Sequence, residues 1–72
     1  MERILTMHSQ TFAIKAKRLL EAQGIYVRIV RPNPKLTPKG CSFGLQADTR
    51  LFSYIMYYLE REKIPFGELM DL

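Results

Sequence analysis

Apolar and polar positions follow two different periods along the chain, and the changes between them mark six elements. Short runs that are rich in β-branched residues, or that carry apolar residues at alternate positions, predict strands at 3–8, 25–30, 42–47 and 66–72. Apolar residues spaced three and four apart predict helices at 10–23 and from about 49 to 63. The predicted order is therefore strand, helix, strand, strand, helix, strand.

The ends of both helices have recognisable sequence signals. Ser9 is a natural N-cap for the first helix, and Gly24 supplies the left-handed residue that commonly ends one. Asp48 or Thr49 caps the second helix, and Pro65 stops it. The residues expected to form the apolar stripes are Phe12, Ala13, Ala16, Leu19 and Leu20 in the first helix, and Leu51, Phe52, Ile55, Met56 and Leu59 in the second.

This order of elements predicts an α+β fold of the ferredoxin-like type. Such a β-α-β-β-α-β chain forms a two-layer sandwich, in which two helices cover one face of a four-stranded antiparallel sheet. Right-handed crossovers fix its handedness. The 72 residues suffice for a single domain, 1–72, with one hydrophobic core of modest stability.

The loop between the second and third strands contains the most distinctive chemistry. Prolines at 32, 34 and 38 exclude a strand there and stiffen the backbone. The loop also carries Arg31, Lys35 and Lys39, and it leads directly to Cys41, which is the only cysteine. A long, basic loop that delivers one thiol to the start of a strand indicates a functional site.

The expected topology places this thiol beside other polar groups. The third strand lies between the first and second and is antiparallel to both, so Cys41 should lie near His8 and Ser9 at one end of the sheet. Cations, a protonated histidine and a helix N-terminus all stabilise a thiolate. We therefore expect Cys41 to be exposed and to have a lowered pKa. The alternative is a buried, inert cysteine, with His8, Ser9 and the cations as ordinary surface residues.

Composition limits the other possibilities. A net charge of +4 suits an anionic ligand, nucleic acid or an acidic protein. One cysteine forms no internal disulfide, and no Cys/His cluster offers metal ligands, so we expect neither a metal nor a cofactor. No apolar run approaches the length of a membrane span, and no signal-peptide cleavage site follows the first residues. The expected location is cytoplasmic.

These motifs resemble a known family, the selenium/sulfur carrier protein-like domains. The resemblance covers nearly the whole chain and rests on MHS at 7–9, EAQGIYVRIV at 21–30 and RPNPKLTPKGCSFGLQ at 31–46. The chain departs from the family pattern at Ser42, where glycine commonly follows the cysteine, and at Gln46, where arginine is common. The resemblance implies that Cys41 is the carrier cysteine, which would hold a persulfide or perselenide.

The leading hypothesis is thus a sulfur or selenium carrier that needs no cofactor and is more a carrier than a turnover enzyme. Its partners would be a donor protein and a thiol acceptor protein. His8 and Ser9 would stabilise the thiolate, whereas Arg31, Lys35 and Lys39 would contact an anion or a partner. One alternative is a regulatory module that forms a homodimer through the sheet. A weaker one is RNA binding, because KGCSFGLQ at 39–46 partly matches the third-strand motif of RNA-recognition domains.

Overall fold

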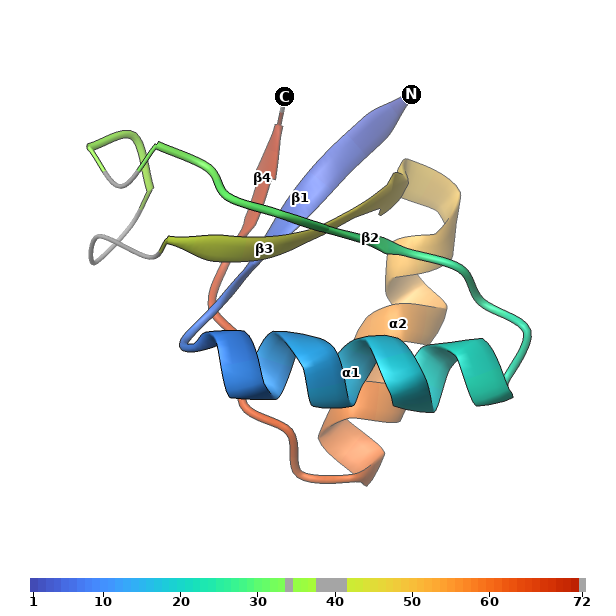
Figure 1. Cartoon of the computed structure of the whole chain (residues 1–72). Coiled ribbons are helices and arrows are strands. Elements are labelled where there is room, and N and C mark those ends of the chain that lie inside the picture. Colours follow the sequence, from blue (N-terminus) through green and yellow to red (C-terminus); the bar gives the residue numbers. More distant parts are fainter. Residues whose placement is uncertain (34, 38–41, 72) are drawn as a thin grey trace.

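The computed structural model describes residues 1–33, 35–37 and 42–71, and its elements occur in the predicted order (Figure 1). They are β1 (Glu2–Met7), α1 (Gln10–Ala22), β2 (Arg28–Val30), β3 (Phe43–Asp48), the 3-10 turn η2 (Thr49–Leu51), α2 (Phe52–Arg61) and β4 (Leu69–Asp71). The bounds of β1 and β3 differ by one residue from the expected ones. The type of each expected strand and helix is confirmed.

The four strands form one antiparallel sheet in the order β2-β3-β1-β4, which is the ferredoxin-like arrangement. Both helices lie on the same side of this sheet (Figure 1). β3 occupies the gap between β1 and β2, as the crossover argument requires. The predicted α+β two-layer fold is therefore confirmed.

The core lies between the sheet and the two helices. Leu5 and Met7 of β1 and Leu45 and Ala47 of β3 point towards the helices and are buried. Successive side chains of a strand alternate between faces, so these residues share one side. The helical residues buried against them are the expected ones: Ala13, Ala16, Leu20, Phe52, Ile55 and Leu59.

The opposite face of the sheet brings β1 and β3 close together at Gly44. A Cβ atom at Gly44 would lie 2.5 Å from Cγ2 of Ile4 and 3.2 Å from the carbonyl oxygen of Leu5. The branched side chain of Ile4 has few rotamers with which to avoid it. Glycine at this position therefore permits the close approach, and Ile4 is the neighbour that a larger side chain would meet.

β2 is shorter than predicted, because the end of α1 uses the residues before it. Gly24 has a φ of 78°, its N–H donates to the carbonyl oxygen of Glu21, and Ile25 N–H donates to that of Leu20. This is the Schellman pattern of helix termination. The backbone N–H of Ile25 thus completes the helix end, and the strand starts only at Arg28.

The second helix also departs from its expected limits. Asp48 accepts a hydrogen bond from Arg50 N–H at 2.9 Å, so it caps the 3-10 turn, and the α-helix begins later, at Phe52. The helix ends at Arg61 rather than near Lys63, because Lys63 adopts a left-handed φ of 57°. Lys63 therefore holds the position that Gly24 holds at the end of α1.

β4 starts later than predicted because two residues face one on the neighbouring strand. Thr6 N–H donates to the carbonyl oxygen of Glu68, Gly67 N–H donates to that of Thr6, and Glu68 N–H donates to Thr6 Oγ1 at 2.8 Å. Two residues opposite one is the arrangement of a β-bulge, which interrupts a regular ladder. Regular pairing consequently begins at Leu69.

Candidate functional site

The end of β1 meets the start of β3 at one end of the sheet. Met7, the last residue of β1, is paired with Phe43, the first residue of β3. His8 follows Met7 directly and is exposed. Antiparallel pairing puts the end of one strand beside the start of its neighbour. The predicted meeting of these two chain segments is therefore confirmed as far as Phe43.

Ser9 joins this end of the sheet to α1. Its backbone is extended, and its Oγ accepts the N–H of Phe12 at 3.2 Å. The cap uses a lone pair of the hydroxyl, which leaves the hydrogen of the O–H group available as a donor. The other N–H groups of the first helical turn carry a partial positive charge of roughly half a unit. Ser9 thus offers a donor and also holds the helix start in place.

Arg31 lies at the same end, over an aromatic ring. Its guanidinium carbon is 5.3 Å from the ring centroid of Phe43. A cation at this distance is attracted by the face of the ring, which is worth about 0.5–1 kcal/mol at an exposed site. Arg31 therefore places a fixed positive charge beside the start of β3, and Phe43 is the residue that positions it.

The described part of the following loop is organised by Asn33. Its Oδ1 accepts the backbone N–H of Lys35 at 3.0 Å, and its carbonyl oxygen accepts that of Leu36 at 2.9 Å. These bonds define an Asx-type turn, which fixes the backbone on which Lys35 is exposed. The sequence reasoning singled out the prolines and overlooked Asn33, and it gave Phe43 no role beside Cys41. An asparagine before a proline is a turn signal that could have drawn attention to Asn33.

Two of the predicted site residues, Cys41 and Lys39, lie outside the described residues. Among the others, His8, Ser9 and Arg31 are placed at the end of the sheet where β1 ends and β3 starts. Lys35 is exposed in the loop, with no acidic group within ion-pair distance in the described chain. The predicted role of these side chains around Cys41 stays a prediction.

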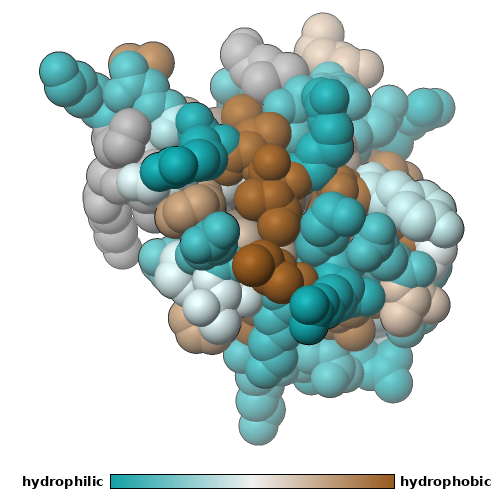
Figure 2. Space-filling model, in the orientation of Figure 1, coloured by the Kyte–Doolittle hydropathy of each residue, from teal (hydrophilic) through white to brown (hydrophobic). Residues whose placement is uncertain are grey.

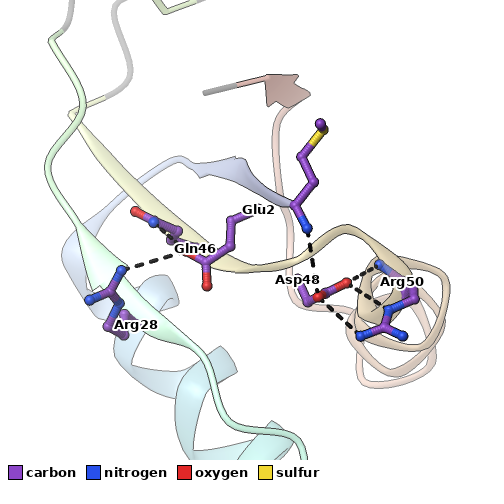
Figure 3. A network of polar contacts seen from close by, with 6 residues as sticks. Glu2, Arg28, Gln46, Asp48 and Arg50 are labelled. Atoms are coloured by element: carbon purple, nitrogen blue, oxygen red, sulfur yellow. Dashed lines mark hydrogen bonds and ion pairs between the residues drawn. The ribbon is translucent and has the colours of Figure 1, made fainter.

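The other end of the same strands carries a network of polar side chains (Figure 3). Glu2 of β1 accepts a hydrogen bond from Gln46 of β3 at 2.6 Å, and its carboxylate lies 3.6 Å from the guanidinium of Arg28 on β2. Asp48 contacts Arg50 by two side-chain hydrogen bonds and one backbone bond. The charges at this end are therefore neutralised in pairs.

Asp48 should titrate well below an ordinary aspartate. The side-chain hydrogen bonds from Arg50, and then its backbone N–H, lower the pKa of Asp48 from 3.8 to about 2. A lowered pKa contributes stability that is present above pH 3.8 and is lost as the pH falls through about 2. We expect an NMR titration of the carboxyl carbon to give this pKa, and Arg50→Gln to raise it. Equal pKa values in the two proteins would contradict the assignment.

In the described strands, the open face of the sheet carries no aromatic side chain of the kind that RNA-recognition domains use. Such domains stack bases on aromatic residues of this face. Here Leu5 is buried in the core, and Phe43 packs against it from the same side. Leu5 of β1, and Phe43 of the stretch 39–46, are therefore turned towards the helices.

The described residues contain no group of three or more His, Cys, Asp or Glu that could hold a metal ion. Within the same part of the chain, no helix has the length and apolar character needed to cross a membrane.

The topology described above defines a small ferredoxin-like domain. Its candidate site region lies at the end of the sheet where Ser9 caps α1 and Arg31 adds a positive charge beside Phe43. A family model described as "Putative Se/S carrier protein-like" matches residues 2–70. The chain belongs to this family, as the sequence motifs implied. Searches of curated proteins and of solved structures found no match.

Proposed function

We propose that this protein carries sulfur or selenium on Cys41, as a persulfide or perselenide. The observation that carries the proposal is family membership over residues 2–70, in a chain with a single cysteine. The carrier step needs a nucleophilic sulfur, and Cys41 is the one thiol of the chain that can supply it.

Loading is a thiol exchange with a persulfide donor. The Cys41 thiolate attacks the outer sulfur of R–S–SH, a new S–S bond forms, the bond of the donor breaks, and R–S⁻ leaves. The product is Cys41–S–SH, and unloading to an acceptor thiolate repeats the exchange in the same sense. The outer sulfur moves as a neutral atom, so neither direction requires an external oxidant or reductant.

The described surroundings support the proposal through charge. The persulfide and its thiolate precursor are both anions, and they are stabilised by cations and by the N-termini of helices. Arg31 over Phe43 supplies a cation at the start of β3, and Ser9 fixes the first turn of α1. Cys41 precedes Phe43 by two residues in the sequence, and we propose that these groups act on its sulfur.

Direct loading tests the proposal. We expect incubation with glutathione persulfide to increase the protein mass by one sulfur atom, and peptide mapping to place that atom on Cys41. We also expect the rate of alkylation by a small neutral reagent to have a midpoint below the ordinary thiol value of ~8.5. Absence of loading, together with a thiol that reacts only after unfolding, would mean that Cys41 is structural.

A further inference from the structure

Some basic residues of the described chain are paired with acidic ones and others are not. In the described chain, the four with an acidic side chain within ion-pair distance are Arg3, Lys17, Arg28 and Arg50. Lys15 and Arg18 on α1 have no such neighbour in the described chain, unlike Lys17 on the same helix. Since paired charges largely cancel at a distance, α1 contributes a positive field that its own surroundings do not neutralise.

Lys15 and Arg18 line a shallow hollow on the outer side of α1. The hollow has a volume of about 280 Å³, and the described residues that line it are Thr11, Ile14, Lys15 and Arg18. They are spaced at three and four residues and so share one face of the helix. Ile14 is 37% exposed at this surface, although most large apolar residues of α1 are covered. Long basic side chains add apolar stems to such a surface while their charges stay in water.

The front of the molecule also carries exposed apolar surface. α1 crosses the lower front in Figure 1, and in the same orientation Figure 2 shows an apolar strip mostly above the position of α1, with hydrophilic residues on both sides. An apolar centre with a charged rim is the usual composition of a protein-binding surface.

We propose that an acidic protein docks on the surface formed by Thr11, Ile14, Lys15 and Arg18. The partner inserts an apolar side chain against Ile14 and places carboxylates on Lys15 and Arg18. The occupant follows from charge complementarity, because two cations without an acidic neighbour in the described chain line the same hollow as one exposed aliphatic side chain. If the carrier function proposed above holds, the docked partner is a sulfur donor or acceptor. This follows because the surface begins at Thr11, two residues after Ser9, which caps the helix at the candidate site.

A protein fits this surface better than a nucleic acid does. Binding of a single strand combines phosphate contacts with aromatic rings on which bases stack. The hollow offers an aliphatic side chain in place of such a ring. Its spacing instead matches a partner helix or loop that presents one apolar residue between acidic ones.

The probe is a short helical peptide with one leucine and glutamates three and four residues away on either side. It is titrated into the ¹⁵N-labelled protein carrying Cys41→Ser, so that binding is measured independently of sulfur loading. We expect amide shifts concentrated between Thr11 and Arg18. Reversing both cations (Lys15→Glu with Arg18→Glu) should weaken binding by about tenfold or more. Ile14→Ser, or replacement of the peptide leucine by serine, should also weaken binding, although neither change alters the charge of the protein or of the peptide.

A matched control separates the surface from net charge. Arg61→Glu with Lys63→Glu gives the same net charge, but it changes two exposed residues outside the hollow. The proposal is overturned if this control weakens binding as much as the reversal on α1, or if the serine peptide binds as well as the leucine peptide. It is also overturned if the shifts fall on the open sheet face, or if an RNA oligonucleotide binds the α1 face more tightly than the peptide. If the Cys41→Ser protein binds the peptide as expected but the wild-type protein cannot be loaded with persulfide, the docking surface stands and the carrier function is refuted.

Discussion

Replacing Cys41 with serine is expected to abolish persulfide transfer while leaving the fold intact. A serine hydroxyl has no sulfur with which to form the S–S bond, and it is not ionised near neutral pH, so neither loading nor unloading can occur. An exposed cysteine would contribute little to folding, so in that case the free energy of unfolding should change by less than about 0.5 kcal/mol. A buried cysteine would behave differently, because serine would then bring a hydroxyl into the core at a cost of roughly 1–3 kcal/mol.

The measurement is the release of hydrogen sulfide when excess thiol is added to protein that has been treated with glutathione persulfide and desalted. Wild-type protein should release about one equivalent per loaded thiol, and the serine variant none. Ser42→Ala is the matched control, because it removes a neighbouring hydroxyl and leaves the thiol. Transfer that persists in the Cys41→Ser protein would eliminate the carrier function, and a large loss of stability in that variant would identify a structural cysteine.

Replacing Gly67 with alanine is expected to give a large loss of stability. A Cβ atom there would clash with Thr6 Oγ1 and lie 3.3 Å from the carbonyl oxygen of Thr6. Thr6 is completely buried, so its side chain has no space into which to move. Overpacking of this kind costs about 1–3 kcal/mol, and displacement of Oγ1 would also break the hydrogen bond from Glu68 N–H. A domain of this length is stable by roughly 4–11 kcal/mol, so the loss would be a large fraction of the total.

Urea unfolding of the single and double variants isolates the clash. The Gly67→Ala substitution should lower the free energy of unfolding by less in a Thr6→Ala background, because the oxygen that the new methyl group meets is then absent. In a Thr6→Ser background, which keeps that oxygen, the loss of stability should be as large as in the wild-type protein. Gly24→Ala serves as a comparison, since no atom lies within 4 Å of the new methyl group and only its positive φ of 78° opposes the change. Equal costs of the Gly67 substitution in the two Thr6 backgrounds would contradict this explanation.

The element types could be predicted from the sequence, because each depends on a local period that a single core enforces. Leu45 lies between Gly44 and Gln46, and Ala16 and Leu20 recur at helical spacing, so each pattern has one face to bury. Some boundaries could not be predicted, because distant atoms set them. β4 starts at Leu69 since Gly67 and Glu68 both bond Thr6, a residue far away in the sequence.

The candidate site, like the fold, was predictable only in part from the sequence. Local signals indicated Ser9 as a helix cap, and the topology rule placed the end of β1 beside the start of β3. The contact of Arg31 with Phe43 was not predictable, since a ring and a cation separated by a proline-containing loop meet only when the strands are paired. Asn33 was missed because the prolines around it dominated the interpretation of the loop.

The sequence by itself determined the order of the elements, the ferredoxin-like class, the family and the single thiol available for chemistry. These depend on periodicity, on turn residues and on which residue types are present. The tertiary structure alone decided which cations are neutralised and which are not, because ion pairs such as Arg28 with Glu2 join separate strands. It also decided where β4 begins, and it produced the α1 hollow, since these depend on distances between atoms that folding brings together.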